Sequence, residues 1–544
     1  MIRSIAFTIV ALSCALWSRP ADACGCFAPS TTITPVIQAG ERIVFAVRDG
    51  KVIAHVQIQY SGNASDFGWL LPLPSVPTLK TGSDELFNRL LEETDPVFTT
   101  AGNVKCRPIQ LGCAFAPARL ASNRGTDGTV DAGTVAVKQG SVGPYDFAVL
   151  SAADKTAMLK WLNDNRYFIP TGTDSAVDPY INPGAYFLAL KLQSDRSAGD
   201  VTPIVLEYES SYPMIPITLT SVGATPNMGV QVFMLGQGRG IPRNYAHVTI
   251  NDALLNWASG VTNYSEIVTR AVGEAPGKHA FVTDYAGPTT PLKLPFSRFG
   301  SEADLAAATT PEAFVAQLKS AQFDRADNFD PLVVSLIVKQ LPVPAAVGVD
   351  ANTWVNSLGY YLGQYRTENP DKFTGYTATL DAPALAHDIF TQYVKPTREA
   401  FALFDEFPKL TRLYTTLNPE DMNVDPVFAF NASLPDVARE HRSIQDFGCG
   451  ETEVTTEQGW MVKPSTKLDG LPAALSIATV PEEGTPTILT NNIAKIHQKV
   501  PLLDTSETAA QQQGCSSVDP VSLLSFAALV AFSRRARRRT GTTA

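Results

Sequence analysis

A strict alternation of apolar and polar residues runs through residues 42–60 and predicts the first element of the fold. Apolar side chains occupy every second position on both sides of Asp49-Gly50, a dipeptide favoured at the turn of a two-stranded hairpin. The segment therefore predicts a β-hairpin. His55 falls between the apolar positions of the second strand, so we expect it on the polar face.

The period of two recurs up to about residue 295, whereas residues after Ser301 follow the helical period. We expect strands at residues 67–71, 145–150, 186–192, 203–209, 215–220, 229–235 and 245–250, and helices at 302–308, 311–320, 331–340, 353–365 and 383–393. The predicted fold class is α+β, with a β-rich domain over residues 24–300, a mainly helical region over residues 301–480 and apolar helices at both ends. Residues 481–515 lose periodicity and end in a glutamine-rich stretch, which predicts a polar linker.

The first 23 residues have the order of a secretory signal peptide. Arg3 precedes a mostly apolar stretch over residues 5–17, and Ala21-Asp22-Ala23 provides small residues for cleavage. About thirteen residues are too few to span ~30 Å of hydrocarbon at 1.5 Å per residue. We therefore expect residues 1–23 to be removed, so that the mature chain begins at Cys24. A lipid on Cys24 would instead require a bulky aliphatic residue where Ala21 stands.

A short apolar run, residues 521–532, is followed by a cluster of arginines over residues 534–539. Such a basic block stays on the cytoplasmic side of a membrane. The apolar residues point in all directions, which suits lipid better than the alternative, a buried terminal helix. Together with Cys515, residues 516–540 resemble the myxobacterial C-terminal sorting signal. The resemblance implies processing near Cys515, with the membrane and sorting machinery as partners.

Composition places the chain among packed globular proteins. Of its 544 residues, 44% are hydrophobic and 18% are charged, which excludes disorder throughout. The whole chain carries a net charge of −10, but the terminal segments hold seven of the 43 basic and two of the 53 acidic residues, which leaves −15 on residues 24–515. Because such an acidic surface repels phosphate backbones, we expect no nucleic-acid partner.

Apart from Cys14 in the expected signal peptide and Cys515 beside the apolar tail, five of the seven cysteines belong to the body of the chain. In an exported protein, disulfides are the default state of cysteines. Cys106 and Cys113 enclose a short loop, which predicts a small disulfide-closed hairpin, and Cys449 would then pair with Cys24 or Cys26. Because five is odd, one thiol stays free or pairs elsewhere. Zinc is the alternative, but no C-x-x-C pair occurs in the chain.

Several short motifs follow one another along the β-rich region. They are Cys24-Gly25-Cys26-Phe27, the run Gly-Trp-Leu-Leu-Pro-Leu-Pro over residues 68–74, a strand and helix over residues 145–162, and Tyr212-Pro213-Met214. Together they resemble a bacterial family of exported proteins, the domain of unknown function 2330, over roughly residues 24–300. Residues 410–428 resemble a segment near the end of its longer members. The resemblance implies location at the cell envelope and brings no known reaction.

No local catalytic motif emerges from the sequence. The six histidines stand singly, without a paired ligand spacing, and no G-x-S-x-G turn occurs. Cys449 lies between two glycines and could act as a nucleophile with His441 as its base, but a disulfide is the commoner role in an oxidising compartment. The stretch Gly236-Gln-Gly238-Arg-Gly240 opens no helix that could face a phosphate, so we interpret it as a connection between strands.

Two further sets of side chains could bind a ligand. The acidic candidates for calcium are Asp127, Asp131, Glu420, Asp421 and Asp425. The aromatic candidates for stacking on sugars are Trp161, Tyr167, Tyr360, Tyr361 and Tyr365. Neither acidic spacing matches a calcium loop, and aromatic residues at helical spacing more often pack in a core.

The sequence therefore predicts no catalytic residue, no cofactor and no metal. We expect an exported, envelope-anchored protein that acts as a non-enzymatic surface binding or structural module. The alternative is an exported hydrolase that acts on peptide or glycan through residues dispersed along the chain.

Overall fold

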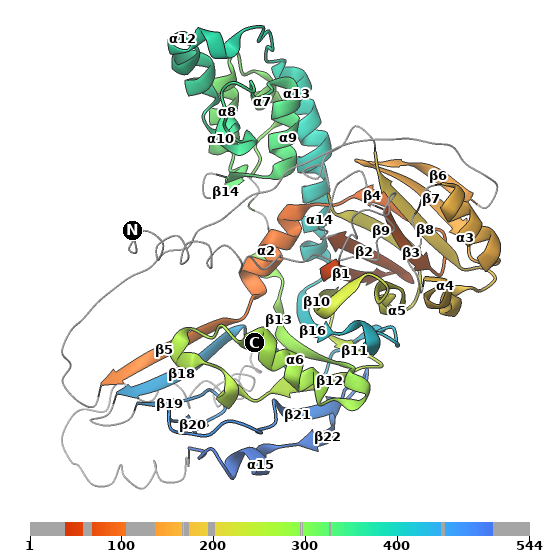
Figure 1. Ribbon diagram of the computed structural model, residues 1–544, viewed down its shortest axis with the longest axis vertical. Helices are drawn as coiled ribbons and strands as arrows, with labels where there is room; N and C mark the ends of the chain where they lie inside the picture. The colour runs from red at the N-terminus through yellow and green to blue at the C-terminus, as the bar shows by residue number, and fades with distance from the viewer. Residues whose placement is uncertain are drawn as a thin grey trace, which may run out of the picture.

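The structure, a computed structural model, combines two packed sheets with a helical unit (Figure 1). It describes residues 38–57, 68–104, 136–165, 167, 173–193, 202–293, 295, 298–325, 328–447 and 452–503. The expected signal peptide, the apolar tail and all seven cysteines lie outside these residues. Within them, no helix is both long and apolar enough to cross a membrane.

The predicted hairpin is confirmed as the middle of a large mixed sheet. Strands β1 (Gln38–Arg48) and β2 (Lys51–Gln57) pair antiparallel, and Asp49 and Gly50 adopt the positive φ angles that their tight turn requires. The strand order is β22-β21-β12-β13-β16-β10-β1-β2-β9-β4. The other eight strands are β4 (Thr78–Thr81), β9 (Ile204–Glu209), β10 (Ala224–Gly236), β12 (Ala246–Ile250), β13 (Ala280–Pro288), β16 (Lys409–Leu417), β21 (Ala474–Thr479) and β22 (Thr487–Asn491).

One face of the large sheet packs against a smaller antiparallel sheet of order β3-β8-β7-β6. Its strands are β3 (Gly68–Leu73), β6 (Ala136–Val142), β7 (Tyr145–Ser151) and β8 (Tyr186–Leu192). Successive side chains of β3 point to opposite faces of the small sheet. Trp69 faces the large sheet, whereas Leu70 faces helix α3 (Lys155–Asp164) on the outer side.

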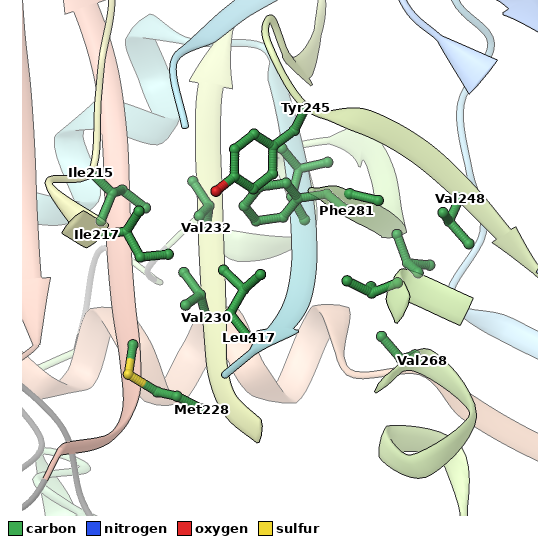
Figure 2. Packing of buried hydrophobic residues seen from close by; sticks show 14 of the residues in the cluster. Ile215, Ile217, Met228, Val230, Val232, Tyr245, Val248, Val268, Phe281 and Leu417 are labelled. Carbon is green, nitrogen blue, oxygen red and sulfur yellow. The ribbon is translucent and has the colours of Figure 1, made fainter. Parts of the chain in front are cut away.

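Helix α6 (Tyr264–Gly273) packs on β12, β13, β16 and β21 at the other end of the large sheet. Ile267, Val268, Ala271 and Val272 of α6 are buried against the strands, as the helical period of an amphipathic face requires. Figure 2 shows the core at this end, where side chains of three neighbouring strands and of the segment before α5 (Ile217–Thr220) pack together. The labelled members include Ile215, Ile217, Val230, Val232, Phe281 and Leu417.

The opposite face of the large sheet carries helices α2 (Asp84–Thr94) and α14 (Lys395–Glu406), whose Phe87 and Phe401 pack on Val44 of β1. His55 pairs with Val44 across the hairpin and therefore points to the same covered face, with only 4% of its surface exposed. The expectation of a polar, open face at His55 is wrong, because both faces of this hairpin are covered.

Residues 299–394 form a helical unit with its own core around the fully buried Trp354. Its helices are α7 (Glu302–Ala306), α8 (Pro311–Ser320), α9 (Pro331–Gln340), α10 (Ala351–Asn356), α11 (Leu358–Tyr360), α12 (Arg366–Glu368) and α13 (Ala382–Ile389). A π-helical turn, η10 (Phe390–Val394), joins α13 directly to α14. The wider turn accommodates Pro396, which lacks an N–H group and would crowd the carbonyl four residues earlier in an unbroken α-helix.

The prediction of a mainly helical region over residues 301–480 is wrong after α14. The chain returns there to the large sheet, and β16 lies between β10 and β13 in its middle. Further strands follow, including β17 (Phe428–Asn431), β18 (Glu440–Phe447), β19 (Glu453–Thr455) and β20 (Met461–Val462). Strand β18 runs parallel to β5 (Val97–Val104) in a third sheet.

Two smaller predictions also fail. The expected linker cannot begin at residue 481, because β22 pairs with β21 and the following α15 (Ile493–His497) buries Ile496 in the main core. The expected strand over residues 215–220 contains the short helix α5 instead. Its β-branched residues favour a strand, whereas the fixed φ of the preceding Pro216 suits the first turn of a helix. The local sequence does not reveal which of these two preferences prevails.

Candidate functional site

A pocket of about 260 Å³ opens between the two packed sheets and is named here the Glu41 pocket. Strands β1, β2 and β9 form one wall, β3 forms the other, and the segments around residues 179–185 and 210–216 complete it. The described residues that line it are Glu41, Ile43, Phe45, Ala54, Val56, Trp69, Leu71, Pro72, Leu73, Pro74, Pro179, Tyr180, Asn182, Ala185, Leu206, Tyr208, Ser210, Tyr212, Met214 and Pro216.

The alternation of the strands explains this lining. Glu41, Ile43 and Phe45 occupy every second position of β1, so all three side chains point to the same side of the sheet. The same period selects Leu206 and Tyr208 on β9. Because the inner positions of both sheets are apolar, the wall is apolar almost throughout.

Glu41 is the exception to this apolar wall. Its side chain is 8% exposed, and no described residue hydrogen-bonds its Oε2 atom. Burial raises the pKa of Glu41 to about 7, because a carboxylate loses most of its hydration there. No Lys, Arg or His side chain occurs among the described residues of the lining. At neutral pH the pocket therefore holds a carboxyl group poised between its neutral and its charged form.

The tyrosines of the pocket are held in place by contacts behind the wall. The Tyr180 hydroxyl donates to an Asp425 carboxylate oxygen at 2.7 Å, and the Thr218 hydroxyl donates to the other oxygen at 2.8 Å. The Tyr212 ring lies under the Arg243 guanidinium, 4.3 Å from its centre. Burial raises the pKa of Tyr180 and of Tyr208, so both hydroxyls stay neutral at ordinary pH. The aromatic faces are thus rigid and uncharged.

A second, more polar cleft of about 440 Å³ lies on the opposite face of the large sheet, beside α6. The buried guanidinium of Arg412 on β16 stands 3.2 Å from a carboxylate oxygen of Asp284 and also contacts Asp95. Tyr264 donates a hydrogen bond to Asp284, and Tyr414 contacts Ser265 at 3.0 Å. Burial raises the pKa of Asp284, whereas Arg412 opposes this shift.

Two of the acidic candidates for calcium, Asp421 and Asp425, are engaged by different partners in the fold. Asp421 pairs with Lys278 at 2.9 Å, whereas Asp425 accepts the hydrogen bonds from Thr218 and Tyr180. Asp127 and Asp131 lie outside the described residues. Among the residues that the structure describes, no group of three His, Cys, Asp or Glu side chains could hold a metal ion.

The glycine-rich stretch connects β10 to β11 (Arg239–Pro242), as the sequence predicts. Its glycines serve close packing against neighbouring strands. A Cβ atom on Gly236 would lie 2.4 Å from the Phe430 ring, and one on Gly240 would lie 2.4 Å from the Cβ of Met234. The glycines are therefore explained without a phosphate.

His247 and His441 take part in the packing of the fold. His247 lies in a buried polar cluster, 2.8 Å from the Thr283 hydroxyl, where burial lowers its pKa to about 3. His441 stacks on Phe98 and contacts a Glu457 carboxylate oxygen at 2.9 Å. Its suggested nucleophile Cys449 lies outside the described residues, as do Cys24, Cys26, Cys106, Cys113 and Cys515.

Two of the five aromatic candidates lie inside a core. Trp161 and Tyr167 are each more than nine-tenths buried, and Tyr361 stacks on Trp354. Tyr360, by contrast, is 48% exposed. Tyr360, Tyr361 and Tyr365 pack ring against ring with centroids 5.2–5.7 Å apart, so burial argues against a sugar platform only at Trp161 and Tyr167.

Sequence reasoning missed Glu41. The signal available was its position, since it shares the alternation of Ile43 and Phe45 and is the acidic residue on an otherwise apolar face. The pocket itself had no local signal, because its walls come from segments as far apart as residues 41 and 216.

One comparison with known proteins gives a match. The model of a protein family described as an uncharacterized protein conserved in bacteria (DUF2330) matches residues 20–329, which is more than half of the chain. This range contains every lining residue of the Glu41 pocket. No curated protein and no solved structure matches the chain.

Proposed function

This chain belongs to the DUF2330 family of uncharacterized bacterial proteins, and we propose that it is an exported, envelope-anchored binding module whose Glu41 pocket takes a small apolar ligand. The observation that carries the proposal is the pocket itself. It is concave, mostly apolar and lined by aromatic rings, with few polar groups, which is the usual character of small-molecule sites.

The two ends of the sequence support the proposed location. Residues 1–23 have the order of a signal peptide, and residues 516–540 that of a membrane-associated sorting tail. The intact mass of protein recovered from the cell envelope, before and after reduction, measures both processing sites and counts the disulfides. An unprocessed chain with seven free thiols in the cytoplasm would contradict export.

Ligand binding is tested by titrating the purified protein with N-phenyl-1-naphthylamine, a neutral apolar dye that fluoresces in dry sites. We expect saturable fluorescence that is lost in Ala54→Phe, because the new ring fills the pocket from β2. Val137→Phe adds the same ring at a position that is 54% exposed, and should leave binding unchanged. Equal binding by all three proteins would contradict the proposed site.

The second candidate function is an exported hydrolase acting on peptide or glycan, and the cleft at Arg412 favours the glycan form. Asp95, Tyr264 and Tyr414 line it, and Arg412 links Asp95 to the fully buried Asp284, whose pKa burial raises. Glycoside hydrolysis uses two carboxyl groups, one of them a protonated acid. Release of reducing ends from a glycan panel, abolished by Asp284→Asn, would support this alternative, and no release would contradict it.

A further inference from the structure

We infer that the ligand of the Glu41 pocket is a small organic cation, an ammonium group on an apolar body. This inference rests on the proposed function, because it names the ligand class of the same pocket. It follows from three observations: the missing counter-charge, the aromatic lining and the direction of the neighbouring charges.

The first observation is that Glu41 is a buried carboxyl group with no positive charge among the described residues of the lining. Glu41 is the one charged residue among the described residues of the lining, and no described residue hydrogen-bonds its Oε2 atom. An ionised carboxylate in an apolar wall costs free energy unless a cation or several donors satisfy it. Since the described protein supplies neither, an incoming ammonium group would provide both the charge and the hydrogen bonds.

The second observation concerns the rings that share the pocket with Glu41. Phe45, Trp69, Tyr180, Tyr208 and Tyr212 all contribute to the lining. Aromatic faces attract cations through their negative quadrupole, and they also pack against an apolar body. Negatively charged ligands would meet the Glu41 carboxylate without a basic partner, and neutral ligands would leave it unsatisfied. Among positive, neutral and negative ligands, only a positive one would interact favourably with both the Glu41 carboxylate and the aromatic rings.

The third observation is that charged groups on the adjacent strands point away. Arg42 follows Glu41 on β1, and its guanidinium bonds to Gln231 and Gln57 on the other face of the sheet, at 3.0 and 3.1 Å. On β9, Glu207 alternates with Leu206 and Tyr208 and pairs instead with Lys51. His55 of β2 also lies on the far face. The other titratable groups in the described lining are Tyr180, Tyr208 and Tyr212, and the Arg243 guanidinium lies against the Tyr212 ring.

The test compares three ligands of similar shape: 2-phenylethylamine, 2-phenylethanol and phenylacetate. Calorimetric titration of the purified protein at pH 8 should show the amine binding at least tenfold more tightly than the alcohol, and phenylacetate not at all. In Glu41→Gln the amine should lose this preference. Glu207→Gln removes the same charge from the other face of the sheet, and should keep the preference.

The wild-type protein provides a readout that does not depend on the folding of a variant. The amine keeps its charge between pH 6 and pH 8, whereas Glu41 must lose its proton to pair with it. With a pKa of about 7 for Glu41, the affinity for the amine should rise about tenfold over this range, and the affinity for the alcohol should not change.

The outcomes separate this inference from the proposed function. Equal affinities for amine and alcohol at pH 8, or a preference that survives in Glu41→Gln, would overturn the cation while leaving an apolar binding site. If the neutral dye also fails to enter the wild-type pocket, the proposed function itself is wrong. Tight binding of phenylacetate would overturn the inference as well, since it requires a positive group at the site.

Discussion

The backbone of Val104 pairs with that of Phe447, the last residues of the parallel strands β5 and β18. Cys106 and Cys449 each follow two residues later in the sequence, outside the described residues. Because the described strand ends lie side by side and each cysteine is only two residues further along the chain, we infer a link between these two cysteines as an alternative to the Cys106–Cys113 loop expected from sequence.

We therefore expect non-reducing peptide mapping of the exported protein to yield a peptide that joins Cys106 to Cys449. Replacing Cys449 with serine should then free the Cys106 thiol for alkylation, whereas replacing Cys113 should not. A Cys106–Cys113 peptide in the wild-type digest would contradict this prediction and restore the sequence-based pairing.

The raised pKa of Glu41 predicts a pH-dependent cost to stability. Between about pH 4.5, its ordinary pKa, and about pH 7, its pKa in the fold, the folded state binds a proton that the unfolded state has lost. The contribution of Glu41 to the free energy of unfolding therefore falls as the pH rises through this window, by about 3 kcal/mol in total. Glu41→Gln removes the effect, because its amide carries no charge.

The measurement is urea denaturation of wild type and Glu41→Gln from pH 4 to pH 8. We expect the variant to gain stability relative to wild type as the pH rises, with the gain complete above pH 7. Glu207→Gln serves as the control and should show no such gain. A difference between wild type and Glu41→Gln that does not change with pH would contradict the prediction.

Glu85 of α2 joins the helical unit to the large sheet. Its buried carboxylate accepts hydrogen bonds from Arg325 at 2.6 and 2.9 Å and lies 2.6 Å from Arg298. Glu85→Ala leaves these guanidinium groups without their buried partner and should cost about 3–5 kcal/mol. Glu92→Ala removes a half-exposed carboxylate that contacts the same Arg325, and should cost less than about 1 kcal/mol.

Hydrogen exchange is the readout, because it reports the opening of the helical unit separately from the sheets. In Glu85→Ala the amides of α8 and α9 should exchange faster than in Glu92→Ala. Equal protection in the two variants would show that the ion cluster does not hold the unit in place.

The glycine at the start of β11 should tolerate no side chain. Gly240→Ala places a Cβ atom 2.4 Å from the Cβ of Met234, and overpacking of this kind typically costs about 1–3 kcal/mol. Gly273 at the end of α6 has open space around the same position, so Gly273→Ala should be neutral or stabilising by up to about 1 kcal/mol. Melting temperatures of the two variants measure the contrast, and a stable Gly240→Ala protein would contradict it.

Local sequence predicted those elements whose cause is local. The hairpin at Asp49-Gly50 depends on a turn that these two residues favour, and α8 is capped by Thr310, whose hydroxyl accepts a hydrogen bond from the Ala313 amide. The placement of β16 was not predictable in this way. Its partners β10 and β13 lie more than a hundred residues earlier, and a buried strand carries no mark of which neighbours it joins.

The Glu41 pocket was predictable from the sequence only in part. The position of Glu41 on an apolar face can be read from the alternation of β1, but its isolation depends on β3 and on the segment near Tyr212, which cover it from far along the chain. The sequence shows where Glu41 lies on its strand, but it does not show which distant segments bury the side chain. The loss of hydration that raises the pKa of Glu41 is therefore a property of the assembled fold.

The insertion of β16 between β10 and β13 also dictates an order of folding. Until Leu417 has been synthesised, β10 and β13 each keep an edge with unpaired amide and carbonyl groups, open to pairing with another chain. Closing the sheet requires contacts between residues far apart in sequence, which slows folding. A fragment that stops at residue 329, where the family match ends, should therefore aggregate, and the complete chain must be kept from collapsing early while it is being made.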